Sequence, residues 1–443
     1  MLAPPGDVVP GGVLAIRSHV TAPDVTPSPD LTALLPRHAY RYPARLVDAV
    51  VAYEPGRRLV AIKQVTVSEE FFQGHFPGLP LMPAVLQIEA LTQAASALVL
   101  EHCGLPTARV ALRGITGGKF RRGVVPGDQL RLELTLQRAR TRLAIVQAAA
   151  FVGTDVVAEA TLLLAIDPGP AAVHPTAIVH AGARIGRGSV VGPHCVIGPD
   201  VRIGERCRLG ASVVVDGITS IGDETEIFPM ASIGLAPQDL KYHGEPTRLS
   251  IGRRNVFREF VTINRGTEGG GGETRIGDGN LFMAYVHVAH DCRVGSDTIF
   301  GPHATLGGHV TVDNYANVSA GSAVHQFCRV GPFAFVGGYS VVTKDALPYA
   351  RTIGSRPARV FGVNSIGLSR RGFTSDTISQ LKRAYRYLLQ SKLNTSRALA
   401  AIERDPTLTS DEVRLLVEFI RTSKRGVILR RPTRRAEELV AEE

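Results

Sequence analysis

The sequence lacks the features that mark secreted and membrane-spanning proteins. Its five cysteines are odd in number and form no CxxC pair, which argues against a disulfide framework and for a reducing compartment, the cytoplasm. No run of eighteen apolar residues occurs, so no transmembrane helix is predicted. Residues 1–30 are rich in proline and glycine but have neither a basic start nor a continuous apolar segment. They are therefore predicted to be a disordered arm and not a signal peptide.

Acidic residues are outnumbered by basic ones, 40 to 50, which gives a formal net charge of +10. Such a balance suits nucleic acid, an anionic membrane surface or an acidic protein partner, and it equally suits a merely soluble basic surface. At 443 residues the chain is too long for one ordinary core. We therefore expect at least two domains.

Apolar residues recur at every sixth position over most of the C-terminal half. One run extends from Val173 to Ile233 and a second from Ile276 to Val342. Neither a helix nor an ordinary strand repeats at six, whereas a parallel β-helix does. Three short sides close a coil of about eighteen residues whose inward positions are apolar. The sequence thus predicts a left-handed parallel β-helix in which residues eighteen apart are stacked directly.

Two segments lie between these regular runs. Ile233 and Ile251 are eighteen residues apart, so residues 235–249 are predicted to fill a full coil in register. Ile263 and Ile276 are thirteen apart, one more than two hexads, so the glycine-rich GTEGGGGET between them is predicted to leave the β-helix. Loops that leave a solenoid commonly build its binding sites.

The flanking parts of the chain follow other patterns. The N-terminal part alternates strand-like runs with one helical stretch, Pro83 to about Leu100, which predicts an α+β unit whose sheet buries the helix on every side. After Thr374 the apolar residues return to helical spacing, and Thr409 with Glu412 resembles a capping box that opens a further helix. The C-terminal part is therefore expected to be a helical cap on the solenoid.

Five segments follow from these boundaries. They are an arm (1–30), an α+β domain (31–167), a linker (168–172), a β-helix domain (173–357) and a helical domain (358–443).

An imidazole and a carboxyl group lie fourteen residues apart in the N-terminal part. His75 lies in the turn-rich GHFPGLP, and Glu89 interrupts the apolar helix. A buried carboxylate is costly unless it has a partner, and a carboxyl group beside an imidazole makes an acid/base pair suited to eliminating water β to a carbonyl. The alternative is a structural histidine and a glutamate paired with an arginine.

The residues around this pair resemble the (3R)-hydroxyacyl-acyl carrier protein dehydratases of fatty acid synthesis. The motifs are FFQGHFPGLPLMPAVLQIEALTQAA, RYP, VAIKQVT, KFRR and VVPGDQLRLE. That family has a hot-dog fold, in which a sheet surrounds one long helix. The resemblance implies that His75 removes the α-proton and Glu89 protonates the leaving hydroxyl, the two being contributed by different protomers of a dimer.

The sequence departs from that family at three positions. Ala84 stands for the usual glycine at the helix start, Ala49 for an arginine, and Gly123 for a proline. Ala84 lies where a backbone amide would polarise the thioester carbonyl, so added bulk there would slow or narrow the dehydratase. An inactive hot-dog module kept as a scaffold is therefore the alternative.

A second polar group lies along one column of the predicted β-helix. HVAHDC carries His287, His290 and Asp291, and the column places Gly308 and Gln326 eighteen and thirty-six residues beyond His290. They are expected to line one wall.

Two more histidines, His309 and His325, fall one position off this column. Clustered imidazoles indicate either acid/base chemistry or a metal site. The metal alternative is a zinc enzyme of the γ-carbonic anhydrase type, which is also a β-helix. The spacing decides weakly against it, so no metal is expected.

The C-terminal motifs resemble those of the UDP-N-acetylglucosamine O-acyltransferases that begin lipid A synthesis. They are QDLKYHGEPTR, VTINRGT, HVAHDC, AVHQFC and FGVNSIGLSRRGF, within a resemblance that covers residues 173 to about 428. It implies a trimer with the active site between subunits. It also implies no cofactor, because the phosphopantetheine thioester of acyl carrier protein is a substrate.

The same resemblance implies roles for individual residues. His290 is the general base that deprotonates the glucosamine 3-hydroxyl, Asp291 orients it, and the Gly308 N–H is an oxyanion donor. The residues that hold the nucleotide sugar are Asp239, Lys241, His287, His309, His325, Gln326 and Asn364. Arg370 and Arg371 match the arginines of the site for acyl carrier protein and the acyl donor. Gly338 matches the position that measures acyl length, where glycine predicts a long 3-hydroxyacyl group.

Together the two halves predict a bifunctional enzyme that uses (3R)-hydroxyacyl-acyl carrier protein twice. One half dehydrates it to the trans-2-enoyl thioester, and the other transfers it to UDP-N-acetylglucosamine. Acyl carrier protein is acidic, so the basic balance suits docking it and needs no nucleic acid. The arginines expected to contribute are Arg121, Arg122, Arg370, Arg371, Arg430 and Arg431. The acyl length, a 3-amino sugar acceptor and the assembly that joins a dimer-forming half to a trimer-forming half stay open.

Overall fold

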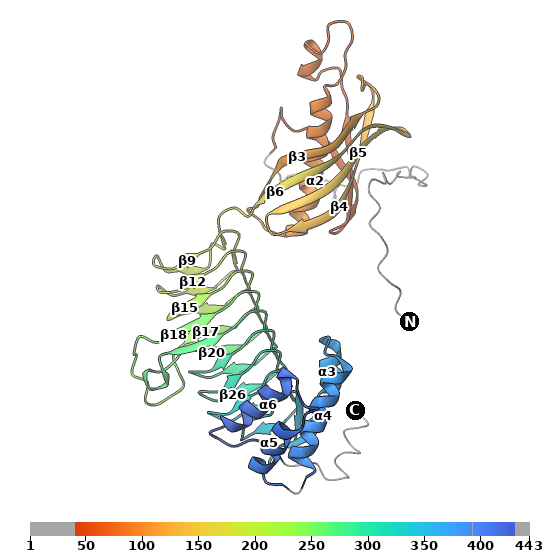
Figure 1. The fold of residues 1–443 in the computed structure, drawn as a ribbon. Coiled ribbons are helices and arrows are strands. Elements are labelled where there is room, and N and C mark those ends of the chain that lie inside the picture. Colours follow the sequence, from red (N-terminus) through yellow and green to blue (C-terminus); the bar gives the residue numbers. More distant parts are fainter. Residues whose placement is uncertain (1–39, 392, 430–443) are drawn as a thin grey trace. The chain divides into compact units, whose positions relative to one another are not determined.

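The computed structural model describes residues 40–391 and 393–429 and divides into two compact units (Figure 1). The N-terminal unit comprises the described residues up to Gly104 together with Arg109–Asp167, and the C-terminal unit comprises Leu105–Ala108 and the chain from Pro168 onward. The predicted arm, Arg430 and Arg431 lie outside the described residues.

The N-terminal unit is a hot-dog fold in which one antiparallel sheet wraps around one long helix, α2 (Ala84–Cys103) (Figure 1). The sheet has the order β1-β2-β4-β5-β6-β3. Its strands are β1 (Ala49–Glu54), β2 (Arg58–Gln64), β3 (Arg109–Phe120), β4 (Gln129–Arg140), β5 (Leu143–Val152) and β6 (Asp155–Asp167), and a 3-10 turn, η2 (Glu70–Gln73), precedes the helix.

Helix α2 forms the core of this unit because its side chains are small or apolar on most sides. Pro83 is its N-cap residue, and Gly104 ends it with a left-handed φ of 60°. Every residue from Ala90 to Leu100 is buried. By length and composition α2 is the one described helix that could cross a membrane, but 72% of that stretch is buried within the protein, as in the core helix of a soluble domain.

The expectation that α2 is buried on every side is wrong for its first turns. Val85 is 73% exposed, and Glu89, one turn later, is only half-buried. The sequence pattern did not reveal this because apolar residues continue across the open side of the helix. Glu89 therefore lies at the edge of the core in the single chain.

One edge of this sheet is long and open. Strand β3 pairs with β6 and ends the sheet, and most of its twelve residues are exposed. Ile115 and Phe120 are each 48% exposed on it. A long exposed edge with apolar side chains favours pairing with another strand.

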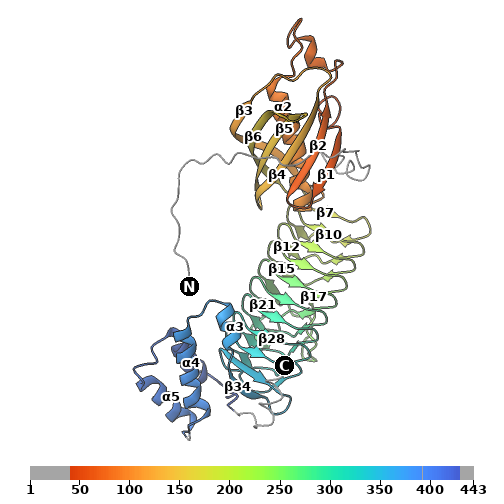
Figure 2. The same ribbon diagram turned by 90° about the vertical axis from the view of Figure 1, so that its right-hand side faces the viewer.

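The C-terminal unit begins with the predicted left-handed parallel β-helix, whose coils pass through three faces in turn (Figure 2). The first face contains β7 (Ala172–Val173), β10 (Val190–Val191), β13 (Arg208–Leu209), β16 (Glu226–Ile227), β19 (Val256–Phe257), β22 (Leu281–Phe282), β25 (Ile299–Phe300), β28 (Asn317–Val318), β31 (Phe335–Val336), β33 (Ala350–Ile353) and β34 (Arg359–Val363). The second contains β8 (Ile178–Val179), β11 (Val196–Ile197), β14 (Val214–Val215), β17 (Ser232–Leu235), β20 (Thr262–Asn264), β23 (His287–Val288), β26 (Thr305–Leu306), β29 (Ala323–Val324) and β32 (Val341–Val342). The third contains β9 (Arg184–Ile185), β12 (Arg202–Ile203), β15 (Ile218–Ile221), β18 (Arg248–Ile251), β21 (Glu273–Ile276), β24 (Arg293–Val294), β27 (Thr311–Val312) and β30 (Arg329–Val330).

The stacking rule read from the period of six is confirmed in the regular coils. Val190 pairs with Arg208 and Ile197 with Val215, each eighteen residues on. The second residue of these short strands points inward, and the stacked rings of Phe282 and Phe300 lie 4.7 Å apart in the core. Each coil thus buries its apolar residues only against the coils above and below.

Two excursions interrupt the stack. Ile221 pairs with Ile251 and Ile233 with Ile263, thirty residues apart, so residues 235–249 do not fill a coil in register as predicted. They add twelve residues, which preserves the period of six but not that of eighteen. The glycine-rich segment was correctly predicted to leave the β-helix and contains a 3-10 turn, η3 (Glu268–Gly270). Both excursions connect the second face to the third (Figure 1).

Helices follow the last coil. They are α3 (Ser365–Arg370), α4 (Ser375–Leu389), α5 (Thr395–Arg404) and α6 (Asp411–Arg421). Strand β34 extends to Val363, so the helices begin several residues after residue 358, where the helical domain was predicted to start. The capping box at Thr409 is wrong by one position. Ser410 caps α6 by accepting from the Val413 N–H, whereas the Thr409 N–H donates to Gln380.

A buried charge pair joins these helices to the β-helix. Asp345 is 1% exposed, and its carboxylate accepts from the Arg329 Nε at 2.9 Å and from the Ser423 hydroxyl at 2.8 Å. Arg329 also donates to the Phe419 carbonyl oxygen of α6 at 2.6 Å and stacks over the Phe419 ring at 4.1 Å. We call Arg329 and Asp345 the cap brace.

Candidate active sites

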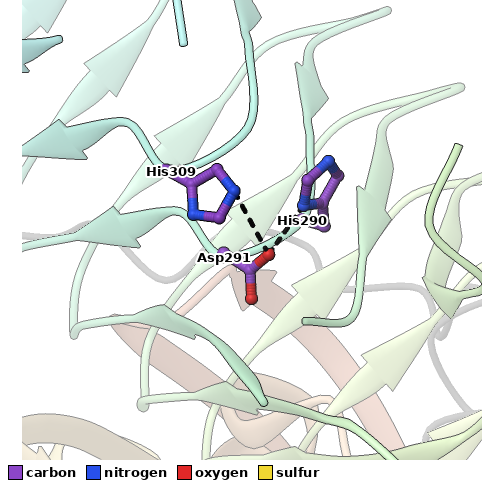
Figure 3. A group of neighbouring side chains, drawn as sticks. All are labelled: His290, Asp291 and His309. Carbon is purple, nitrogen blue, oxygen red and sulfur yellow. Dashed lines mark hydrogen bonds and ion pairs between the residues drawn. The ribbon is translucent and has the colours of Figure 1, made fainter. Parts of the chain in front are cut away.

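His290 lies at a corner of the β-helix where the second face turns into the third, between β23 and β24 (Figure 3). Its Nδ1 lies 2.7 Å from Oδ2 of Asp291. Asp291 has a left-handed φ of 61°, which turns the chain sharply at this point. We call the stacked turns 289–292, 307–310 and 325–328 the His290 corner.

The Asp291 side chain is fully buried and makes several hydrogen bonds. Oδ1 accepts from the Thr267 N–H at 2.9 Å, and Oδ2 accepts from the Thr267 hydroxyl at 2.6 Å. The His309 Nε2 lies 3.8 Å from Oδ2. Because the carboxylate is an acceptor, Nδ1 of His290 carries the proton, and Nε2 presents a lone pair. The described residues provide no hydrogen-bond partner for that Nε2 atom.

Gly308 stacks directly on His290, as the column rule predicts. A Cβ at Gly308 would lie 2.8 Å from Cε1 and 2.9 Å from Nε2 of the imidazole, so no side chain fits there. The Gly308 carbonyl oxygen accepts from the Phe327 N–H at 3.1 Å, and no described residue accepts from the Gly308 N–H. A free backbone donor therefore lies beside the imidazole.

Two more histidines lie near His290, His287 just before this corner and His309 within it. The ring of His287 bonds to the Thr262 hydroxyl at 2.8 Å, and burial, with a smaller effect of His290, lowers the pKa of His287. His309 stacks on Phe327 with ring centres 4.4 Å apart. Burial is also the largest cause of its lowered pKa, and the charges of Asp291 and Asp239 oppose the shift.

The other predicted residues of this corner are more open. His325 and Gln326 are exposed, and His325 lies 3.3 Å from the guanidinium of Arg425. Asp239 and Lys241 lie in the first excursion, which leaves the same corner in an earlier coil, and Oδ1 of Asp239 accepts from the Lys241 N–H at 3.0 Å.

Arg265, which was not predicted as a functional residue, holds this excursion in place. Arg265 donates to the Gly234 carbonyl oxygen at 2.8 Å and to the Tyr242 hydroxyl at 3.0 Å. Arg265 belongs to the VTINRGT motif, and no spacing rule connects it to the first excursion.

Four predicted residues lie away from the His290 corner. Asn364, Arg370 and Arg371 line a pocket of about 370 Å³ between α3 and the first face. Arg371 lies over the Tyr315 ring at 4.8 Å. We call this the arginine pocket, and it lies beside the corner between the third and first faces. Gly338 follows β31 at the remaining corner. One chain therefore does not bring all predicted site residues together.

The ligand atoms of His290, Asp291 and His309 lie within 4.8 Å of one another, which is compatible with a metal site. Their hydrogen bonds favour acid/base chemistry. Both Asp291 oxygens already accept from Thr267, and His290 uses the nitrogen that faces the carboxylate (Figure 3). A metal ion at this point would displace those donors.

In the N-terminal unit, His75 and Glu89 make separate contacts. The Nδ1 of His75 bonds to the Leu81 carbonyl oxygen at 2.8 Å, which leaves Nε2 as an acceptor. Oε1 of Glu89 accepts from the Gln93 amide at 2.9 Å. The described residues contain no hydrogen bond between His75 and Glu89.

Glu89 has two partners that were not predicted from the sequence, Gln93 and Tyr40. Gln93 is buried, donates also to the Ala44 carbonyl oxygen at 2.8 Å, and accepts from the Leu46 N–H at 2.8 Å, so its amide orientation is fixed. The Tyr40 hydroxyl is bonded to Glu89, and burial followed by the Glu89 charge raises the pKa of Tyr40.

The three departures from the dehydratase pattern occupy defined places. Ala84 begins α2, and Ala49 begins β1. At Gly123 a Cβ would lie 3.0 Å from a methyl of Leu81, the residue whose carbonyl oxygen fixes His75. Gly123 thus gives Leu81 room.

Comparison with protein families assigns both units. A FabA-like domain matches residues 39–161. The bacterial transferase hexapeptide matches residues 182–217 and 273–308, and the second domain of UDP-N-acetylglucosamine O-acyltransferases matches residues 345–428. These two matches, on a parallel β-helix, identify the C-terminal unit as a hexapeptide-repeat acyltransferase.

Known relatives specify the family. The chain is 45% identical over 210 residues to the acyl-[acyl-carrier-protein]–UDP-N-acetylglucosamine O-acyltransferase of Herminiimonas arsenicoxydans, covering 47% of this chain and 80% of that one. It is 48% identical over 211 residues to the enzyme of that name from Myxococcus xanthus, covering 48% and 81%. The chain therefore belongs to the acyl-[acyl-carrier-protein]–UDP-N-acetylglucosamine O-acyltransferase family, with a FabA-like domain joined to its N-terminal side.

Solved structures agree with this assignment. A UDP-N-acetylglucosamine acyltransferase from Bacteroides fragilis matches with a TM-score of 0.56 and 42% identity, covering 58% of this chain and 99% of that one. The Arabidopsis enzyme matches with a TM-score of 0.53 and 36% identity, covering 58% and 100%.

Proposed function

We propose that the C-terminal unit transfers a 3-hydroxyacyl group from acyl carrier protein to the 3-hydroxyl of UDP-N-acetylglucosamine. The observation that carries this proposal is the His290 corner, where an imidazole bonded to a buried carboxylate lies against a glycine with a free N–H. An alcohol is a poor nucleophile near neutral pH, so the reaction needs such a base. No cofactor or resident metal is part of the proposal.

In the proposed step, Nε2 of His290 accepts the proton of the sugar hydroxyl as its oxygen attacks the thioester carbonyl. A C–O bond forms, and the Gly308 N–H donates to the resulting oxyanion, a contribution of about 3 kcal/mol in comparable sites. The oxyanion then collapses, the C–S bond breaks, and His290 returns the proton to the pantetheine thiolate. Asp291 keeps the proton of His290 on Nδ1 throughout.

The remaining residues are proposed to bind the substrates. His287 and His309 have lowered pKa values and are neutral near pH 7, so they can hydrogen bond to a sugar without adding charge beside the base. Asp239, Lys241, His325, Gln326 and Asn364 are proposed to complete the nucleotide-sugar site. Arg370 and Arg371 offer two guanidinium groups to an anionic donor.

We also propose that the acyltransferase acts as a trimer. The His290 corner and the arginine pocket lie at different corners of one β-helix, and a neighbouring copy can bring its pocket to the corner. The third corner carries an exposed ladder of rings, in which Phe260, Tyr285 and His303 stack at 4.8 Å. Tyr285 is 50% exposed, and such an apolar ladder is suited to contact between copies.

The acyltransferase is tested with purified protein, a 3-hydroxyacyl-acyl carrier protein and UDP-N-acetylglucosamine, with mass spectrometry of the acylated sugar nucleotide. His290→Ala is expected to lower kcat about 10²- to 10⁴-fold. His180→Ala changes an exposed histidine in the first coil and serves as the control. Transfer that survives His290→Ala would refute the assignment.

For the N-terminal unit we propose dehydration of (3R)-hydroxyacyl-acyl carrier protein to the trans-2-enoyl thioester. His75 takes the α-proton and Glu89 gives a proton to the leaving hydroxyl, so water departs as the double bond forms. The fixed Nδ1 of His75 and the ordered amide of Gln93 beside Glu89 support these roles. The open side of α2 and the exposed edge of β3 support a dimer in which each His75 meets the partner's Glu89.

Both units would then draw on one substrate at a branch between fatty acids and lipid A. The assay is formation of enoyl product without sugar nucleotide. His75→Ala should abolish it and leave acyl transfer intact, while His290→Ala should do the reverse. If the unaltered protein forms no enoyl product but transfers acyl groups, the N-terminal unit is a scaffold, and Ala84 at the start of α2 becomes the first position to restore to glycine.

A further inference from the structure

The glycine-rich excursion (265–272) folds back onto the His290 corner. Its first turn is closed by hydrogen bonds from the N–H groups of Gly270 and Gly272 to the Thr267 carbonyl oxygen, at 3.1 Å and 2.8 Å. Its two ends are fixed to β18, because Gly266 donates to the Arg248 carbonyl oxygen and Arg248 donates to that of Gly272. The excursion is therefore a braced loop that holds its side chains in fixed positions.

The side chain that this loop presents to the corner is Thr267. Of the three bonds that the buried Asp291 carboxylate accepts at 3.0 Å or less, two come from Thr267 and one from His290. An ionised carboxylate removed from water is costly unless donors replace its hydration. Thr267 supplies those donors and fixes the plane of the carboxylate at the same time.

Gly270 closes the other side of the carboxylate. A Cβ at Gly270 would lie 2.0 Å from Cγ and 2.2 Å and 2.3 Å from the two oxygens of Asp291. The backbone of Gly270 is not in the left-handed region, so glycine is needed here for space and not for conformation. At the neighbouring Gly269, by contrast, a Cβ would meet no atom within 4 Å.

We propose that Thr267 is a positioning residue of the acyltransferase. Together with Gly270 it forms a carboxylate clamp that holds Asp291 in line with Nδ1 of His290. Without the Thr267 hydroxyl, Oδ2 keeps only its bond to His290, and the carboxylate can rotate away. The imidazole then loses the acceptor that keeps its proton on Nδ1 and its lone pair on Nε2. This inference rests on the proposed acyl transfer and assigns the glycine-rich excursion to catalysis instead of substrate binding.

The first test compares Thr267→Val with Thr267→Ser. Valine keeps the shape and the N–H but removes the hydroxyl, and serine restores it. Thr267→Val should lower kcat about 10- to 100-fold, as expected for a lost hydrogen bond to a charged group, with KM for both substrates unchanged. Thr267→Ser should stay within about threefold of the unaltered protein. Thr176→Val, which removes a hydroxyl that accepts from the His194 N–H in the first coil, is the control.

A kcat for Thr267→Val within about twofold of the unaltered protein would overturn the proposal. So would a loss that appears in KM alone.

The second test asks whether Thr267 acts through Asp291. In an Asp291→Ala background the clamp has nothing to hold, so adding Thr267→Val should cause no further loss of kcat. An equal loss in both backgrounds would show that Thr267 acts elsewhere and would overturn the proposal.

The third test uses the two adjacent glycines. Gly270→Ala should lower kcat by pushing the carboxylate from its place, while Gly269→Ala should leave it unchanged. Melting temperatures identify any variant that fails to fold. If Gly270→Ala fails to fold, the comparison of Thr267→Val with Thr267→Ser decides the outcome.

Crystal structures of Thr267→Val and Gly270→Ala provide a readout independent of turnover. The proposal expects the bond between Nδ1 of His290 and Oδ2 of Asp291 to lengthen or break in both. An unchanged bond would overturn it. If the unaltered protein transfers no acyl group, the proposed function fails, and these structures still decide whether the clamp exists.

Discussion

At the scale of single residues, His290 is hydrogen-bonded to the Asp291 carboxylate, whereas His287 makes no contact with it and His309 lies 3.8 Å from it. Burial lowers the pKa values of His287 and His309, whereas His290 is bonded to Asp291. Positive charge near the proposed base is thereby limited, and each neighbouring ring can serve as donor or acceptor according to its tautomer.

These lowered pKa values predict how stability depends on pH. Below about pH 6.5 the unfolded chain binds protons that native His287 and His309 resist, so the free energy of unfolding should fall as pH decreases through that range. In His287→Asn and His309→Asn variants the melting temperature should fall less between about pH 7.5 and about pH 5.5. An identical pH dependence in the variants would contradict this prediction. Asparagine suits position 309 because His309 has a positive φ of 62°.

Gly338 predicts the length of the acyl group. A Cβ there would contact only the Ala320 carbonyl oxygen, at 3.5 Å, so the fold tolerates a side chain at this position. If Gly338 lines the acyl site, Gly338→Met should move the preferred donor to a shorter chain by several carbons while the melting temperature is unchanged. Competition among 3-hydroxyacyl-acyl carrier proteins of different lengths, read by mass spectrometry, checks this. An unchanged chain-length preference would remove Gly338 from the acyl site.

The sequence predicted contacts between distant residues only where the period of eighteen applies. It placed Gly308 against His290 because both occupy one column of regular coils. It missed Thr267, whose contact with Asp291 depends on how an excursion folds back and not on any spacing. It also missed Gln93, although Gln93 lies one helical turn after Glu89; only the bonds to Ala44 and Leu46 that fix its orientation are distant in the sequence.

At the scale of elements, the cap brace links the last coils to α6. Asp345 is almost fully buried, and Arg329 reaches from it to the Phe419 carbonyl oxygen. The brace therefore holds the last described helix against the β-helix through one buried carboxylate.

Removing one partner of the cap brace should be strongly destabilising. Arg329→Met leaves the buried Asp345 carboxylate without its guanidinium, for which about 3 kcal/mol is expected. Hydrogen exchange should show faster exchange in α6 before the β-helix is affected. The matched control is Arg421→Met, which breaks the exposed pair between Arg421 and Glu403 and should cost less than about 1 kcal/mol. Equal effects of the two substitutions would contradict the role of the brace.

The elements that the sequence misassigned share a physical cause. Residues 235–249 preserve the period of six while breaking that of eighteen, so the apolar pattern cannot distinguish a coil from an excursion of two hexads. The open side of α2 was hidden in the same way, because an apolar residue such as Val85 marks a core or an interface equally well.

At the scale of the whole molecule, neither proposed site has all its residues in contact within a single chain. His75 and Glu89 have separate partners, and the His290 corner is apart from the arginine pocket. If dimers and trimers both form, two trimers joined through three pairs of N-terminal units give a closed assembly of six chains.

Light scattering after size exclusion should report that assembly. Tyr285→Asp places a charge in the ring ladder and should release dimers that retain dehydration and lose transfer. Ile115→Lys on β3 should release trimers that retain transfer and lose dehydration. If either variant keeps the mass of the unaltered protein and both activities, the corresponding contact is wrong.

The regular coils before the two excursions set the height of the β-helix below the His290 corner. Every coil before them, from β7 to β15, lacks any residue proposed to act in transfer, and each contributes about 4.8 Å of height. The distance from the start of the β-helix to the His290 corner therefore changes only in steps of one coil. Deleting residues 190–207, one repeat of eighteen, would shorten the β-helix by one coil and leave every corner aligned with its neighbours. The number of early coils can therefore change in whole repeats without altering the proposed acyltransferase site.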